Sequence, residues 1–132
     1  MKTVLSTFML ATAVAMAPQS RTTADGVYSA DQATRGEAGF RQNCSSCHGV
    51  DLAGAEGGPP LTGTEFNERW KGMTLNDLFI LMKSTMPQSS PGSLSDKEYI
   101  DILAFILLKG EFPDGTADLV PEEGSLSQIT YQ

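Results

Sequence analysis

The residues best suited to chemistry lie together in the stretch Cys44-Ser45-Ser46-Cys47-His48. This C-x-x-C-H motif uses both cysteines and the only histidine of the chain. Two thiols separated by two residues can reach the vinyl groups on one edge of a haem and form thioethers, and the next residue is then held beneath the iron. The motif therefore predicts one covalently attached haem c, with Cys44 and Cys47 as attachment sites and His48 as an axial ligand.

Other sites also use closely spaced cysteines. A structural zinc site needs four Cys or His ligands, and the chain has only three such residues. A thioredoxin-like redox pair is typical of a βαβ pattern, which the sequence lacks. A disulfide between Cys44 and Cys47 stays open as an alternative, but it would not explain the loops and the methionine described next.

Electron-transfer haem needs a second axial ligand, and a methionine thioether is a common choice. Three of the six methionines lie within the first 17 residues, which we expect to be removed. Met73 precedes a predicted helix and Met82 fits its apolar face, so core packing explains both. Met86 follows that helix and is fixed by Pro87 in an irregular segment. We predict Met86 as the second ligand, with Met82 as the alternative.

The N-terminal segment has the features of a secretory signal peptide. Lys2 gives a positive start, residues 4–17 form an apolar run, and the run ends in the small-x-small sequence Ala15-Met16-Ala17. We predict that residues 1–17 are cleaved and that the protein is periplasmic in a bacterium. An uncleaved membrane anchor is the alternative, although the run is shorter than the roughly 20 residues that span a bilayer. No membrane span is expected after cleavage.

Length and charge limit the organisation and the partners. The 132-residue chain has room for one small domain, and its formal net charge is −7. An acidic surface attracts neither nucleic acid nor an anionic membrane, so we exclude both as partners. The expected divisions are a flexible arm over 18–29, a haem domain over 30–112, and an acidic tail over 113–132 that lies on the surface.

Helical patterns dominate the haem domain, and no alternating strand pattern is present. Asp31 is expected to cap a first helix that carries Gly36 and Phe40 on the face leading to Cys44. The segment 49–63 is rich in glycine and proline, so it is expected to form a loop that shields the site.

Three more helical segments are expected further along the chain. A short one covers 64–70, and a longer one begins at Thr74, where Asp77 completes a weak capping box. The last covers 95–110, with a capping box at its start and a lysine-glycine pair at its end. The sequence therefore predicts an all-α fold.

Over residues 31–110 the chain resembles the class I c-type cytochromes. Gly36 and Phe40, four residues apart, match the glycine and the aromatic residue that precede the haem motif in that family. There this helix crosses the C-terminal helix, where this chain has Ile102 and Phe105. The resemblance implies a class I cytochrome c fold, with crossing N- and C-terminal helices, one or two further helices, and long loops wrapping one haem.

The resemblance also implies roles for residues outside the motif. Pro59-Pro60-Leu61 is similar to the family's proline-x-leucine, so the Pro59 carbonyl is expected to accept a hydrogen bond from the His48 ring. Trp70 matches a tryptophan that donates its indole N–H to a haem propionate, and an ordinary core aromatic is the alternative. Leu78 stands where mitochondrial relatives carry a tyrosine near the methionine sulfur.

The haem pocket is expected to have an apolar wall. Its predicted members are Phe40, Leu61, Phe66, Leu75, Phe79, Leu103 and Ile106.

A narrower resemblance, from Thr64 to the tail, is to bacterial cytochromes found beside or fused to quinoprotein-type dehydrogenases. It implies a one-electron carrier rather than an enzyme, with redox proteins as partners, such as a periplasmic dehydrogenase and a terminal oxidase. A fixed haem subunit of a dehydrogenase complex is one alternative. Another is a haem enzyme or gas-binding protein with an open axial position, which a firm Met86 ligand would exclude.

Overall fold

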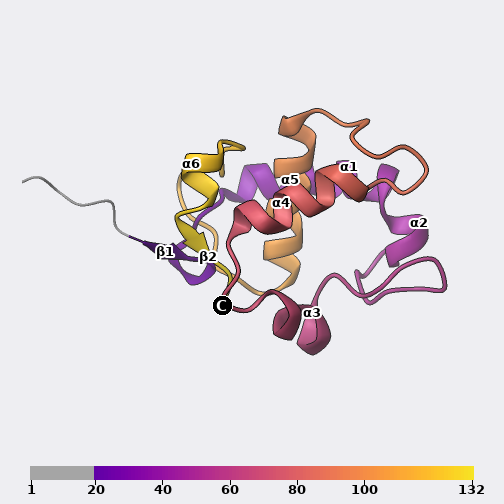
Figure 1. Cartoon of the computed structure of the whole chain (residues 1–132), viewed down its shortest axis with the longest axis horizontal. Helices are drawn as coiled ribbons and strands as arrows, with labels where there is room; N and C mark the ends of the chain where they lie inside the picture. Colours follow the sequence, from indigo (N-terminus) through magenta and orange to yellow (C-terminus); the bar gives the residue numbers. More distant parts are fainter. Residues whose placement is uncertain (1–19) are drawn as a thin grey trace, which may run out of the picture.

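The computed structural model describes residues 20–132, so the predicted signal peptide lies outside the described residues. The described part is mostly helical, as predicted (Figure 1). Its elements are β1 (Arg21–Thr22), the 3₁₀ helix η1 (Thr23–Asp25), α1 (Ala30–Asn43), α2 (Ser45–His48), α3 (Gly63–Trp70), α4 (Leu75–Thr85), α5 (Asp96–Lys109), α6 (Glu123–Leu126) and β2 (Ile129–Thr130). Within residues 20–132 no helix is long and apolar enough to cross a membrane.

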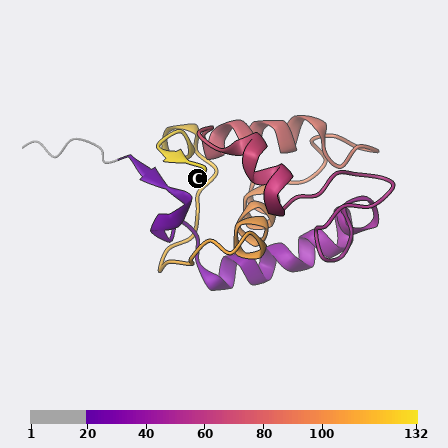
Figure 2. The same ribbon diagram turned by 90° about the horizontal axis from the view of Figure 1, so that it is seen from below.

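Helices α1 and α5 cross at the centre of the fold, as the family resemblance implied (Figure 2). A Cβ atom on Gly36 would lie 1.8 Å from the carbonyl oxygen of Asp101, so the two backbones meet where a side chain is missing. One turn further along α1, the rings of Phe40 and Phe105 pack with their centroids 5.4 Å apart. The glycine-aromatic pair therefore sets both the closeness and the register of the crossing.

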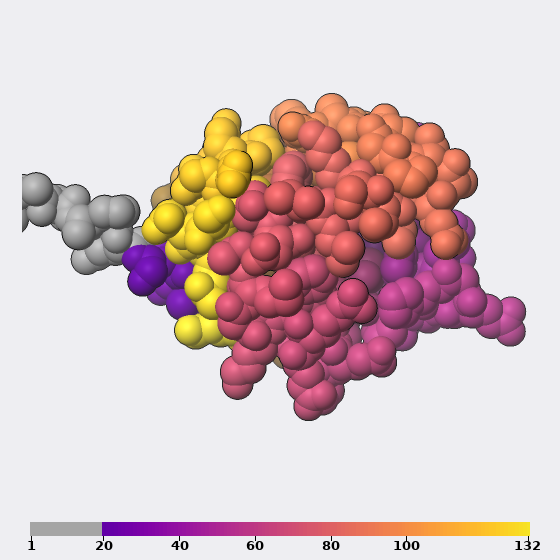
Figure 3. Space-filling view, viewed as in Figure 1, coloured from indigo at the N-terminus to yellow at the C-terminus, as the bar shows by residue number. Residues whose placement is uncertain are grey.

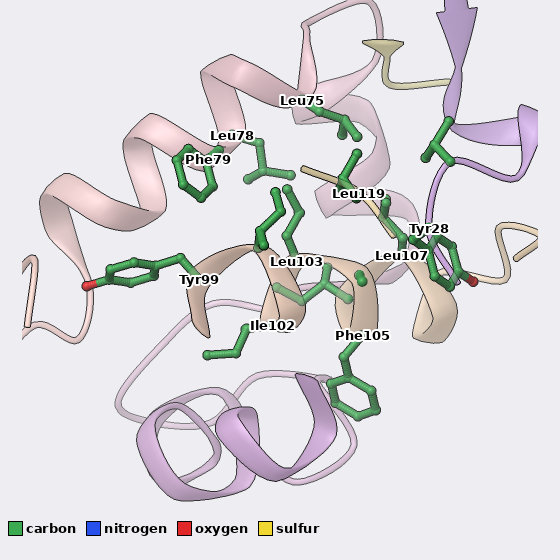
Figure 4. Packing of buried hydrophobic residues seen from close by; sticks show 14 of the residues in the cluster. Tyr28, Leu75, Leu78, Phe79, Tyr99, Ile102, Leu103, Phe105, Leu107 and Leu119 are labelled. Atoms are coloured by element: carbon green, nitrogen blue, oxygen red, sulfur yellow. The ribbon is translucent and has the colours of Figure 1, made fainter. Parts of the chain in front are cut away.

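Helix α5 is the centre of the core, because every residue from Tyr99 to Leu107 is buried. A helix buried on all its faces needs neighbours on every side. Helix α1 covers one side, and α4 covers another through Leu75, Leu78 and Phe79 (Figure 4).

Asp101 is the one charged residue of that buried stretch. Burial alone would raise the pKa of its carboxyl group, but hydrogen bonds from Arg35 and Lys97 outweigh burial and hold the pKa below its usual value. The carboxylate is therefore ionised and paired at the helix crossing.

The predicted capping boxes are present at the starts of α4 and α5. Thr74 pairs with Asp77, and Ser95 pairs with Glu98, each side chain bonding the backbone N–H of the other residue. The start of α1 differs from the prediction. Its N-cap is Ser29, whose hydroxyl oxygen accepts from the N–H of Gln32, and not Asp31. Asp31 lies in the first turn instead, where a negative charge still favours the helix dipole.

The end of α5 also differs from the prediction that Gly110 would be the left-handed residue that terminates the helix. The N–H of Phe112 donates to the Leu107 carbonyl and the N–H of Glu111 to the Leu108 carbonyl, which is a Schellman motif. The left-handed position of this motif is Glu111, at φ 66°, while Gly110 keeps φ −78°. The glycine thus stands one residue before the place where its conformational freedom would help.

The N-terminal segment is not the loose arm that the sequence predicted, and the C-terminal segment is anchored by buried side chains although most of its residues lie on the surface. Strand β1 pairs in parallel with β2, and both Val27 and Tyr28 are buried. Four side chains of the predicted tail are buried as well: Leu119, Leu126, Ile129 and Tyr131. Together the two segments cover the end of the molecule opposite α2 (Figure 3). These apolar residues are spaced irregularly in the sequence. Their burial therefore could not be predicted from a helical or strand period.

We expect Gly36→Ala to lower the free energy of unfolding by about 3 kcal/mol or more, because the added methyl group would force α1 and α5 apart. Denaturant unfolding measures the change. Gly39→Ala is the matched control, since its Cβ would meet only the side chain of Ile102, at 3.1 Å. Equal losses in the two variants would contradict a backbone contact at Gly36.

We expect Glu111→Gly to raise the free energy of unfolding by about 1 kcal/mol. An L-residue in the left-handed region costs roughly 1–2 kcal/mol, and glycine recovers this except for its greater loss of entropy on folding. The thermal unfolding midpoint checks the change. Glu111→Ala keeps the Cβ atom, so a gain of the same size in that variant would assign the effect to the carboxylate instead.

Candidate functional site

The cysteine-histidine motif forms a single helical turn directly after α1. Cys44 ends α1, with its N–H bonded to the Phe40 carbonyl at 2.8 Å, and precedes α2. The N–H of His48 donates to the Cys44 carbonyl at 3.0 Å, which closes the turn. Residues three and four apart share a helix face, so Cys44, Cys47 and His48 are presented together. The α1–α5 crossing thus determines where the motif lies.

The orientation of the His48 ring is fixed by a hydrogen bond. Its Nδ1 atom lies 2.8 Å from the carbonyl oxygen of Pro59, the contact that the family resemblance implied. A carbonyl can only accept, so Nδ1 carries the proton and Nε2 keeps its lone pair for a metal. His48 is buried, with 7% of its surface exposed.

The loop 49–63 packs its backbone against the motif. A Cβ atom on Gly58 would lie 2.9 Å from ring atoms of His48, and one on Gly57 would lie 3.2 Å from three atoms of Cys47. The N–H of Gly54 also donates to the His48 carbonyl at 2.9 Å. Glycine is required here by close approach, and the loop shields the histidine.

A cavity of about 540 Å³ opens beside the motif. Its volume falls in the range of roughly 300–1,000 Å³ that small-molecule and cofactor sites occupy. Most of the predicted site residues line it, namely Cys44, Cys47, His48, Pro59, Leu61, Phe66, Trp70, Met86 and Ile106. The fold therefore brings residues from five separate parts of the chain to one cavity: the motif, the loop after it, α3, the end of α4 and α5.

The predicted wall needs correction, because Phe79 does not line the cavity. Neither do Phe40, Leu75 and Leu103, all of which are buried in the core. On α4 the lining side chains are Leu78, Leu81, Met82 and Thr85, while Leu75 and Phe79 lie on a neighbouring stripe. Helix α4 is apolar on two adjacent stripes, and its sequence does not say which one faces the cavity.

Met86 stands at the end of α4 and lines the cavity. Its N–H donates to the Met82 carbonyl at 2.9 Å, and its own backbone is extended, at φ −124° and ψ 153°. Met82 lines the same cavity one turn earlier. Both predicted thioether candidates are therefore within this site.

Trp70 lies at the end of α3, buried and lining the cavity. Its ring packs beside Phe66 and under the guanidinium of Arg69, which is 5.7 Å from the ring centroid. Arg69 and Glu65 are the charged side chains of the lining, and the sequence did not single them out. The available signal was that Glu65 and Arg69, like Phe66 and Trp70, are four residues apart on one predicted helix.

The two cysteines are free thiols. Burial, together with the neighbouring Cys47, raises the pKa of the Cys44 thiol to about 11. Cys47 is exposed. Among residues 20–132 no three His, Cys, Asp or Glu side chains are grouped so that they could hold a bare metal ion.

These residues fit a covalently attached haem. Two free thiols share one helical turn with a histidine whose Nε2 is unengaged, and all three border an apolar cavity of suitable volume. His48 and one methionine would supply the axial donors, and Cys44 and Cys47 the attachment points.

Comparisons with known proteins agree with this geometry. The family described as "Cytochrome C oxidase, cbb3-type, subunit III" matches residues 31–106, more than half of the chain. No curated protein gives a significant match. A chain in the crystal structure of the sulfane dehydrogenase SoxCD from Paracoccus pantotrophus is similar, with a TM-score of 0.53 and 21% sequence identity. The match covers 82% of this chain and 62% of that chain.

At this identity the likeness to SoxCD shows the fold alone, whereas the family match covers the whole stretch from α1 through most of α5. The chain therefore belongs to the family of cbb3-type subunit III and related cytochrome c domains, which bind covalently attached haem c and transfer electrons.

Proposed function

We propose that the protein is a periplasmic one-electron carrier in which His48 and Met86 are the axial ligands of haem iron attached at Cys44 and Cys47. The observation that carries this proposal is the meeting of His48 and Met86 on one apolar cavity, with the histidine ring held by Pro59. When bound, the haem supplies a reversible one-electron change at its iron.

The residues around the cavity support electron transfer by keeping the proposed iron ligands in fixed positions and by excluding water. The hydrogen bond from His48 Nδ1 to Pro59 fixes the ring and strengthens Nε2 as a donor. Leu61, Phe66 and Ile106 exclude water from the cavity, and a low dielectric favours the less charged state of a redox centre. Ligands held on rigid elements move little when the charge changes, so transfer is fast.

Electron exit is proposed at the haem edge near the two thioethers, on the side where Ser46 of the motif is exposed. Redox encounters use small, short-lived interfaces, so a partner needs only a limited patch here. The partners we propose are a periplasmic dehydrogenase as donor and a terminal oxidase as acceptor. Because the chain carries a net charge of −7, their docking patches should be basic or largely neutral.

Two other functions remain as alternatives of the same site. A fixed haem subunit of a dehydrogenase would differ in partner lifetime and not in chemistry, and co-purification with a large subunit would identify it. A gas-binding protein or haem enzyme would need an open axial position. Met86 and Met82 both line the cavity, so a thioether is available to close it.

We expect the reduced protein to show a sharp c-type α band that carbon monoxide does not change, because both axial positions are filled. Met86→Ala should open one position, so that carbon monoxide binds and shifts the band. Met82→Ala is the matched control, one turn earlier on the same cavity, and should behave like the wild type. The reverse pattern would assign the ligand to Met82.

Prompt carbon monoxide binding by the wild type would instead support the gas-binding alternative. A protein without any haem band, made in a host able to attach haem, would contradict the assignment of Cys44 and Cys47.

A further inference from the structure

The backbone of Met86 is held from two sides. On one side its N–H completes the last turn of α4 by donating to the Met82 carbonyl at 2.9 Å. On the other side its carbonyl accepts a hydrogen bond from the Tyr99 hydroxyl at 2.6 Å. The N–H of Gly92 approaches the same carbonyl at the longer distance of 3.4 Å. The Tyr99 hydroxyl therefore makes the shorter of the two hydrogen bonds to the Met86 carbonyl.

Tyr99 is well placed to act as a fixed anchor. It belongs to the first turn of α5, directly after the Ser95–Glu98 capping box, and only 1% of its surface is exposed. Its ring extends away from α5 toward the chain that leaves α4 (Figure 4). The hydroxyl group is thus supported by the most buried helix of the protein.

The segment after Met86 offers little other support. Residues 88–93 are exposed and contain no helix or strand. The methionine side chain itself is unbranched, with three rotatable bonds, so it does not fix the position of its own sulfur. An anchored backbone at Met86 limits the region that the sulfur can reach. Leu78, which lines the same cavity, is apolar and cannot donate a hydrogen bond to that sulfur.

We propose that Tyr99 is a positioning residue that keeps the Met86 thioether directed into the cavity by holding the Met86 carbonyl. This inference rests on the proposed ligand role of Met86. The tyrosine couples the second axial ligand to α5, and through the Gly36 crossing to α1, the helix that leads into the turn with the first ligand. Loss of the Tyr99 hydroxyl removes this hydrogen bond from the Met86 carbonyl, so a competing ligand displaces the Met86 thioether more easily.

The test is the equilibrium binding of imidazole to the oxidised holoprotein, followed by visible absorption. Imidazole must displace the sixth ligand, so its apparent affinity reports how firmly that ligand is held. Tyr99→Phe removes one oxygen atom and keeps the ring. We expect this variant to bind imidazole about fivefold more tightly, since one hydrogen bond is lost from the ligand-on state.

Tyr28→Phe is the matched control. Tyr28 is also fully buried, and its hydroxyl also donates to a backbone carbonyl, that of Phe112, at 2.6 Å. Phe112, unlike Met86, does not line the cavity. Both variants should lose similar stability against denaturant. Only Tyr99→Phe should change the imidazole affinity.

A third variant, Met86→Ala, tests the ligand role of Met86 separately from the positioning role of Tyr99. If Met86→Ala binds imidazole no more tightly than the wild type, Met86 is not the ligand and the proposed function fails with the inference. If Met86→Ala binds far more tightly while Tyr99→Phe matches Tyr28→Phe, the ligand assignment stands and the positioning role of Tyr99 is wrong. A gain confined to Met86→Ala and Tyr99→Phe supports both.

Discussion

The backbone contact between Gly36 and the Asp101 carbonyl sets how closely α1 and α5 approach, and both ends of the site follow from it. Helix α1 runs directly into the turn that presents Cys44 and His48. Helix α5 carries Ile106 to the cavity and Tyr99 to the Met86 carbonyl. Because one crossing positions both helices, the two axial candidates share a common rigid support.

Charged side chains gather around the same crossing. Arg35 bonds Asp101 on α5 and also Asp118 in the C-terminal segment, at 2.5 Å. Asp118 in turn accepts a hydrogen bond from Ser29, the N-cap of α1. Exposed ion pairs contribute at most about 1 kcal/mol each, so we assign this network mainly to register and to attachment of the tail. The buried apolar side chains of the terminal segments supply most of that attachment.

The cavity joins rigid and irregular parts of the chain. The proposed first axial donor, His48, is held by a loop whose glycines touch the motif, and the proposed second donor, Met86, follows the last turn of a capped helix. Irregular backbone is useful beside both residues: the loop can approach the helical turn of His48 closely, and Met86 lies where the backbone has left the helix. The hydrogen bond that the Pro59 carbonyl accepts from His48, and the one that Tyr99 donates to the Met86 carbonyl, restore the rigidity that these segments lack.

The sequence alone determined the motif, the haem it binds and the capping boxes of α4 and α5, because these depend on residues close in sequence. The helix crossing followed from the family resemblance, which the pair Gly36 and Phe40 carries. Tertiary structure alone decided that Leu78 and Met82, rather than Phe79, face the cavity, since α4 is apolar on two stripes. It also decided that Tyr28 and Tyr131 are core residues. Neither is part of a repeating pattern, and their burial arises from contacts between chain ends that are distant in sequence.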